Sequence, residues 1–253
     1  MMHMPFRILT ALILGWALPV SAMNIQISQS DDEDTQEAEM DLNHRFLFAE
    51  GIIIPGDAKV MKSLLQDQFK NKLRTVILLT SSGGVLEEVD NLKTTILSAA
   101  KQYYAKYKET MIVIVNLECS SACNILLAGL TQGATAANLE IHVANSAKFG
   151  FHSPVDVVKD KTTAIKSKKK FEAKLEKMLK AYENYGVSHA WLNSQQATLH
   201  SPTMTFIDAH KLCEAKAGII PGDACFEHSD NRDLFSDVSA AIQVHKPLFK
   251  KTQ

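Results

Sequence analysis

Glycine, proline and aromatic residues are scarce in this sequence, which has 11 glycines, 7 prolines and 7% aromatic residues in 253 positions. This scarcity excludes a collagen-like chain and a Pro/Gly-rich disordered chain. Four cysteines in 253 residues exclude a small disulfide-rich scaffold. With 46% hydrophobic and 22% charged residues, the composition is that of a globular protein long enough to bury a large core.

The sequence also lacks an excess of either charge. Its 27 basic and 28 acidic residues give a formal net charge of −1. Nucleic-acid binding needs a clear basic excess against the phosphate backbone, so we expect no nucleic-acid partner. Beyond residue 22 no apolar run approaches the length that a bilayer requires, and we expect the mature protein to be soluble.

The first residues, 1–22, have the pattern of a cleaved signal peptide. Arg7 supplies a short positive region, residues 8–18 are apolar, and small residues precede a cleavage point after Ala22. An uncleaved membrane anchor is the alternative. The prediction places the mature protein in an oxidising compartment, periplasmic or secreted. Residues 23–44 follow as an acidic stretch without periodicity, which we interpret as a disordered leader.

The rest of the chain, residues 45–253, alternates predicted strands with predicted helices and contains no evident linker. Short β-branched runs predict strands buried on both faces, and apolar residues at helical spacing separate them. This alternation predicts a single α/β domain with mostly parallel strands. The predicted strands cover residues 46–54, 76–79, 112–115, 141–143 and 149–151, and the predicted helices cover 60–69, 85–103, 122–130 and 209–217.

A lysine-rich amphipathic stretch covers residues 156–185. Nine lysines lie between Lys159 and Lys180, opposite a face that includes Leu175 and Tyr182. The pattern favours a solvated helix laid on the core. An oligomer contact or a docking surface for an acidic partner is the functional alternative.

Three short segments combine the residue types that acyl transfer needs. Gly83 and Gly84 end one strand, and paired glycines let a turn expose backbone N–H groups. Ser121 lies at a second strand-to-helix turn, where the helix N-terminus favours negative charge. His152 follows a third strand and can accept a hydroxyl proton near neutral pH. Each also has a plain structural alternative: a tight turn, a helix N-cap or a structural histidine. The segments cover residues 80–84, 118–123 and 150–154.

In this order the segments resemble the proteolytic subunit of Clp protease and its relatives, including the signal-peptide peptidase A group. The resemblance covers roughly residues 45–220, and the Cys-x-Ser-Ala-Cys form around Ser121 is similar to exported ClpP-like proteins in particular. It implies a ClpP/crotonase-like spiral of β-α-β units with a mostly parallel sheet. It further implies a homo-oligomer that packs through the 156–185 region.

Carried over by position, the resemblance implies Ser121 as nucleophile and His152 as its general base. Ser120 is the fallback nucleophile, because a slip of one residue at the turn is conceivable. The oxyanion hole would be formed by backbone N–H groups, whose loss typically costs about 3 kcal/mol each. Those N–H groups belong to Gly83 or Gly84 and to Ala122.

The match breaks at the third member of the triad. The family has an acid just before an aromatic residue and a helix, and here that position falls near Met204, which cannot orient an imidazole. Asp208 and Asp156 are the substitutes nearby, although Asp208 also suits a helix N-cap. Because loss of the orienting acid can cost about 10⁴ in rate, a Ser–His dyad, a substituted partner and an inactive site all stay open.

The four cysteines suggest disulfides in an exported protein. Pairing Cys213 with Cys225 would close a short Gly-Pro-Gly loop. The alternative is a zinc site that adds two histidines three residues away, His210 and His228, and we favour the disulfide because the compartment oxidises thiols. Cys119 and Cys123 flank Ser121 and could be bridged, buried as free thiols or catalytic.

The sequence therefore predicts an exported ClpP-like serine peptidase that hydrolyses peptide bonds by acyl transfer to Ser121, with no metal or nucleotide cofactor. The expected substrate is a peptide or protein, membrane proteins included. The alternative is a catalytically inactive scaffold of the same fold that binds peptides or proteins in the periplasm, because a fold does not fix a function.

Overall fold

The computed structural model describes residues 23–27, 44–71, 74–144, 146–158, 161–165, 167–222 and 224. The predicted signal peptide, residues 1–22, lies outside these ranges, as does the last part of the predicted domain. Within the described ranges, no helix has both the length and the apolar character needed to cross a membrane.

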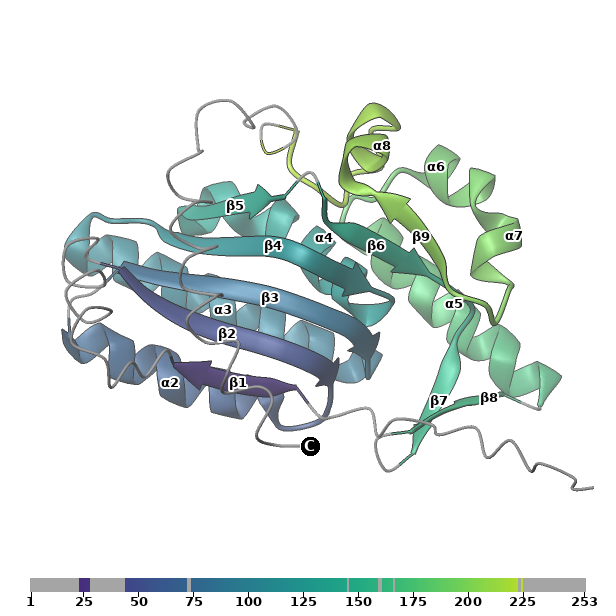
Figure 1. Ribbon diagram of the computed structural model, residues 1–253, viewed down its shortest axis with the longest axis horizontal. Helices are drawn as coiled ribbons and strands as arrows, with labels where there is room; N and C mark the ends of the chain where they lie inside the picture. Colours follow the sequence, from purple (N-terminus) through teal and green to yellow (C-terminus); the bar gives the residue numbers. More distant parts are fainter. Residues whose placement is uncertain are drawn as a thin grey trace, which may run out of the picture.

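A seven-stranded mixed sheet forms the centre of the molecule (Figure 1). Its strand order is β1-β2-β3-β4-β6-β9, and β5 pairs with the first half of β4 while β6 pairs with the second half. β2, β3, β4, β5 and β6 run parallel, and the edge strands β1 and β9 run antiparallel. The predicted α/β class with a mostly parallel sheet is therefore confirmed. The bounds are β1 Asn24–Ile27, β2 His44–Ile53, β3 Arg74–Gly84, β4 Met111–Ser120, β5 Leu139–Val143, β6 Lys148–Phe151 and β9 Thr205–Asp208.

Each of the first three parallel strands is followed by a helix on the same face of the sheet (Figure 1). This is the alternation that the apolar spacing predicted. These three strands and three helices are longer than predicted, whereas the predicted helix over 209–217 ends at Glu214. The helices are α2 Asp57–Asn71, α3 Leu86–Tyr107, α4 Ala122–Ala137, α5 Lys168–Asn184, α6 His189–Ser194, α7 Gln196–Leu199 and α8 Ala209–Glu214.

The central strands are buried on both faces, as their β-branched runs predicted. Alternate residues such as Ile77 and Val113 join the large core that also contains the helices. The residues between them face the other way and form a second cluster, in which each burial contributes roughly 1.5–3 kcal/mol. That cluster consists of Phe46, Phe48, Val76, Leu78, Ile112 and Ile114.

The predicted disordered leader is wrong for its first residues. Residues 24–27 form β1, which pairs antiparallel with β2 in the register Ile25↔Ala49 and Ile27↔Leu47. Met23 is buried at 7% exposure and Ile25 packs against the core. The apolar–polar alternation of these residues is a strand signal, too short to stand out beside the acidic run that follows.

The predicted continuous stretch over residues 156–185 is also wrong. Its first part is a two-stranded antiparallel hairpin of β7 (Val155–Val158) and β8 (Lys161–Ala164), which projects from the main sheet (Figure 1). Helix α5 begins only at Lys168, where the Ser167 side chain accepts a hydrogen bond from the Lys170 N–H. The valines and threonines before Ser167 favour strand over helix, because β-branched side chains pack well on a pleated surface.

Candidate active site

The carboxyl ends of three adjacent parallel strands bring the three predicted segments together. Ser81 of β3 lies opposite Cys119 of β4, and Ser120 of β4 lies opposite Gly150 of β6. The Ser121 N–H then donates to the Gly150 carbonyl over 2.8 Å. Open α/β sheets bind ligands at this edge, because loops from neighbouring strands converge there.

Ser121 occupies a strained turn between β4 and α4. Its φ of 52° and ψ of −118° are unusual for a residue with a Cβ, and such conformations cost about 1–3 kcal/mol. Bonds on both sides hold it: its N–H binds Gly150, and its carbonyl accepts from the Tyr182 hydroxyl at 3.4 Å. A strained strand-to-helix turn is one way in which hydrolases expose a nucleophilic serine.

A disulfide spans this turn. Cys119 and Cys123 are bonded to each other, and both are fully buried. Of the three roles left open for this pair, the bridged one is the observed one, so neither is a catalytic thiol. The disulfide links the end of β4 to the first turn of α4 and thereby restricts how far the backbone at Ser121 can relax.

The predicted pairing of Cys213 with Cys225 is tested only in part. Cys213 is disulfide-bonded, while its predicted partner Cys225 and the zinc alternative's His228 lie outside the described residues. A cysteine held in a disulfide does not offer a thiolate to zinc. Among the described residues no cluster of three or more His, Cys, Asp or Glu side chains could hold a metal ion.

Gly83 is a glycine because Ser121 lies against it. A Cβ at Gly83 would stand 2.6 Å from the Ser121 Cβ, and φ there is +107°. The Gly83 N–H donates to the Ser81 hydroxyl over 3.1 Å. Gly83 is therefore the wrong choice for an oxyanion donor, because its N–H already has an acceptor.

Gly84 and Ala122, the other two predicted donors, both line a pocket together with Ser121. A Cβ at Gly84 would collide with the Ile53 carbonyl oxygen at 2.1 Å, which explains the second glycine. Ala122 is the first residue of α4, so its N–H has no acceptor within the helix. The residue after a nucleophile commonly supplies such an N–H to the oxyanion.

His152 is one residue past the position on β6 that faces Ser121. Its ring is half-buried, and burial lowers its pKa below the usual value of 6.5, so the imidazole is neutral at pH 7. Nδ1 lies at hydrogen-bond distance from the Ser153 carbonyl oxygen, and as a donor it would leave Nε2 as the basic atom. Among the described residues no hydrogen bond joins the Ser121 hydroxyl to the ring.

Asp208 does not orient His152. It lies opposite Lys148 on the β6–β9 ladder and forms an ion pair with that lysine. Lys148 precedes His152 by four residues, which is about 13 Å along a strand. The same ladder pairs Phe151 with Thr205, so its next step would set Met204 beside His152. A methionine at this place offers the imidazole only a weak acceptor.

The second substitute, Asp156, lies in β7, where its backbone pairs with Thr163. Its side chain falls outside the described part of the structure. Ser120, the fallback nucleophile, is wrong: it is fully buried, and its hydroxyl donates to Glu118 Oε1 over 2.7 Å. The polar group that contacts His152 Nδ1 is thus the Ser153 carbonyl.

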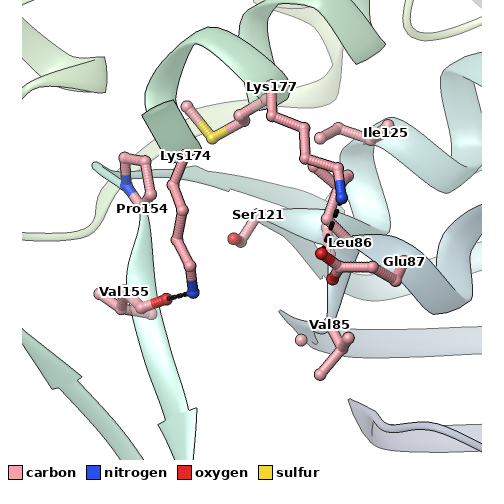
Figure 2. A pocket seen from close by; sticks show the side chains of 12 residues that line it. Val85, Leu86, Glu87, Ser121, Ile125, Pro154, Val155, Lys174 and Lys177 are labelled. Carbon is pink, nitrogen blue, oxygen red and sulfur yellow. Dashed lines mark hydrogen bonds and ion pairs between the residues drawn. The ribbon is translucent and has the colours of Figure 1, made fainter. Parts of the chain in front are cut away.

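The pocket beside Ser121 also contains residues that sequence reasoning missed. Lys174 and Lys177 reach down from α5 on either side of Ser121 (Figure 2). Lys174 donates to the Val155 carbonyl at 3.3 Å, and Lys177 pairs with Glu87 at 2.7 Å. In a segment with nine lysines, nothing in the sequence singles these two out. The lining comprises Gly84, Val85, Leu86, Glu87, Ser121, Ala122, Ile125, Pro154, Val155, Lys174, Lys177 and Met178.

Asn124 is a further missed residue. It is fully buried in the first turn of α4, and its Nδ2 donates to the same Gly150 carbonyl that accepts from Ser121. Because these two hydrogen bonds end on the same carbonyl oxygen, they fix the separation of α4 and β6. An asparagine inside a run of small apolar helix residues was a signal that could have identified it, because buried amides need partners.

Comparison of the sequence with protein-family models and with curated proteins found no match.

Proposed function

We propose that the protein is an exported serine peptidase of the ClpP/crotonase type, with Ser121 as nucleophile and His152 as general base. The single observation that carries the proposal is the strained Ser121 turn, which lines a pocket at the carboxyl edge of the sheet, with His152 directly after the neighbouring strand β6. Strain of this kind persists only where surrounding bonds enforce it, and it clusters at functional sites.

In the proposed reaction, His152 Nε2 takes the proton of the Ser121 hydroxyl as Oγ attacks the substrate carbonyl carbon. The N–H groups of Gly84 and Ala122 stabilise the resulting oxyanion, each by about 3 kcal/mol. The imidazolium returns its proton to the leaving amine, and the C–N bond breaks. A water molecule, deprotonated by the same imidazole, then hydrolyses the acyl ester and restores Ser121.

The Ser153 carbonyl would take the orienting role of the missing acid. A carbonyl fixes the ring tautomer as a carboxylate does, because both accept from Nδ1–H. It carries only a partial negative charge and stabilises the imidazolium less. We therefore expect a slower enzyme than one with a complete triad.

Lys174 is the alternative base. It lines the same pocket as Ser121, whereas His152 is not among the lining residues. A lysine can replace histidine in this role when it is neutral, as serine–lysine hydrolases illustrate. The two bases predict opposite results for substitutions at His152 and Lys174.

The spiral arrangement of the ClpP/crotonase fold, a homo-oligomer and a periplasmic or secreted location belong to the same proposal. The succession of parallel strands β2, β3 and β4, with the helices that follow them on one face of the sheet, supports the fold. The described cysteines are all disulfide-bonded, which supports the location. Disulfides persist in oxidising compartments and are rare in the cytosol.

The test is covalent labelling of the purified full chain with a fluorophosphonate, which traps an activated serine. We expect one label per chain, located on Ser121 by peptide mapping. Ser121→Ala should abolish labelling. Ser82→Ala, which changes an exposed serine of the neighbouring segment, should leave it intact. Folded protein that resists the probe at every pH would overturn the proposal.

A non-catalytic scaffold is the second candidate, and two observations favour it. Among the described residues no carboxylate stands behind His152, and the Ser121 hydroxyl has no hydrogen bond to the ring. In that case the pocket binds peptides without cleaving them. Absence of labelling, together with peptide binding by the native protein, would establish this function.

A further inference from the structure

A buried tyrosine from another helix reaches the strained turn at Ser121. Tyr182 lies in α5, 61 residues after Ser121, and its side chain is only 1% exposed. Its hydroxyl donates to the Ser121 carbonyl oxygen over 3.4 Å. Burial raises the pKa of Tyr182, so the hydroxyl keeps its proton at neutral pH and serves as a donor. Tyr182 is not among the residues that line the pocket.

The same carbonyl accepts from a second donor. The backbone N–H of Asn124, in the first turn of α4, donates to the Ser121 carbonyl oxygen over 3.0 Å. On the other side of the residue, the Ser121 N–H donates to the Gly150 carbonyl. Hydrogen bonds therefore hold both peptide units that flank Ser121, and Tyr182 is the side chain that holds the second unit.

The Ser121 carbonyl and the Ala122 N–H belong to one peptide unit. Such a unit is planar, and in the trans form its C=O and N–H point in opposite directions. Bonds that hold the Ser121 carbonyl therefore also fix the direction of the Ala122 N–H. Ala122 lines the pocket, and its N–H has no acceptor within α4. This peptide unit thus links the buried tyrosine to a donor that belongs to a pocket residue.

We propose that Tyr182 is a positioning residue for the oxyanion hole, because its hydroxyl holds the peptide unit between Ser121 and Ala122 so that the Ala122 N–H meets the developing oxyanion. The inference rests on the proposed function. When this N–H binds the oxyanion, electron density moves onto the Ser121 carbonyl oxygen, and the bond from Tyr182 strengthens. An interaction that strengthens in the transition state raises the rate of the chemical step.

The test replaces Tyr182 with phenylalanine in the full chain, which removes the hydroxyl and keeps the ring. The fluorophosphonate suits this test because its phosphoryl oxygen also gains negative charge as Ser121 attacks. Labelling at increasing probe concentration separates the maximal rate from the half-saturating concentration. Tyr182→Phe should lower the maximal rate about 10- to 100-fold, because a misplaced donor loses most of its effect. The half-saturating concentration should stay within about twofold, since Tyr182 does not line the pocket.

Tyr103→Phe is the matched control. Tyr103 is also 1% exposed, and its hydroxyl donates to Glu109 over 3.3 Å. It packs against Phe69 and makes no recorded contact with the turn. Each variant loses one hydroxyl hydrogen bond from a buried ring, so urea denaturation should show similar small losses of stability. Only Tyr182→Phe should slow labelling.

The pH dependence separates positioning of the oxyanion donor from disturbance of the base. The pH midpoint of labelling should be the same in the wild type and in Tyr182→Phe, because the hydroxyl acts on the Ala122 N–H and not on His152. An unchanged maximal rate, an equal loss in Tyr103→Phe or a shifted midpoint would each overturn the inference.

Failure of the proposed function gives a different result. A wild-type protein that resists the probe refutes the hydrolysis and, with it, this role of Tyr182. A wild type that is labelled at the same rate as Tyr182→Phe keeps the hydrolysis and refutes the role of Tyr182 alone.

Discussion

The two ends of the central sheet are built in opposite ways. At the amino end, Arg74 donates to the Thr110 carbonyl at 2.9 Å and binds both carboxylate oxygens of Glu140, which also contacts His142. At the carboxyl end, the backbone at Ser121 is strained and its hydroxyl has no hydrogen bond to any described residue. At the amino end Arg74, Thr110 and Glu140 bind one another within the fold, whereas at the carboxyl end the Ser121 hydroxyl binds no described residue.

This contrast assigns different work to the two ends. A closed network of paired charges stabilises the fold and offers nothing to a substrate. A strained turn beside a pocket lowers stability and is retained where a function requires it. Substitutions at the carboxyl end should therefore change reactivity more than stability, and those at the amino end should do the opposite.

The largest expected effect is on reactivity at His152. His152→Gln should slow fluorophosphonate labelling by about 10²–10⁴-fold, because a general base contributes that much. In the wild type the labelling rate should fall as the pH drops through a value below 6.5, since burial lowers the pKa of His152 and only the neutral ring accepts a proton. Labelling rates of the wild type and of His152→Gln, measured across pH, test both expectations.

Lys174→Met provides the counter-test. It should leave the labelling rate within a few-fold if His152 is the base. If instead Lys174→Met removes labelling and His152→Gln retains it, the proton acceptor is the lysine.

Next in size is the contact between Gly83 and Ser121. Gly83→Ala adds a methyl group 2.6 Å from the Ser121 Cβ, so the serine must move and labelling should be lost. Gly56→Ala is a matched control: its φ of +106° nearly equals the +107° of Gly83, yet no atom lies within 4 Å of the added Cβ. Both variants should lose about 1–2 kcal/mol to backbone strain, and only Gly83→Ala should lose labelling. Equal labelling of the two variants would show that the contact between Gly83 and Ser121 does not control reactivity.

Removing the Cys119–Cys123 disulfide should affect both properties. Replacing the pair with alanine should lower the free energy of unfolding by about 2 kcal/mol, from the closure of a short loop. Labelling of Ser121 should slow further than this stability loss explains, because the turn can then relax toward a common conformation. Urea denaturation and labelling rates on one preparation test this. An unchanged rate would limit the disulfide to supporting the fold.

The sequence was most informative where local pattern and strand order suffice. Runs such as residues 112–115 mark central strands, and the carboxyl ends of parallel strands meet at one edge, so the neighbourhood of Ser121 and His152 was predictable. The place of Ser121 at a strand-to-helix turn was likewise predictable. That Ser120 is fully buried was not predictable, because its burial depends on the register between β4 and β6.

The misses share one physical cause: they depend on which residues face each other across distant elements. Asp208 binds Lys148 because of the β6–β9 register, which no local pattern encodes. A backbone carbonyl, that of Ser153, is invisible to any search for acidic side chains. Which of the α5 lysines reach the pocket depends on where the helix begins, and the β7–β8 hairpin displaced that start to Lys168.

The smallest expected effect is at the amino end. The neighbouring His142, followed by Thr110 and Arg74, lowers the pKa of Glu140 from 4.5 to about 2. A lowered carboxyl pKa stabilises the fold above pH 4.5 and loses that contribution as the pH falls toward 2. Because Glu140 is 42% exposed, solvent screening limits the contribution to about 1 kcal/mol.

Glu140→Gln should therefore lower the free energy of unfolding by about 1 kcal/mol at pH 7 and by less near pH 3, where the wild-type carboxylate begins to protonate. Urea denaturation at both pH values measures the difference. Fluorophosphonate labelling of Ser121 should not change, because Glu140 pairs at the opposite end of β4 from the serine. A variant that kept its stability but lost labelling would break the division of work between the two ends, since the amino end would then control the turn at Ser121 through the length of the sheet.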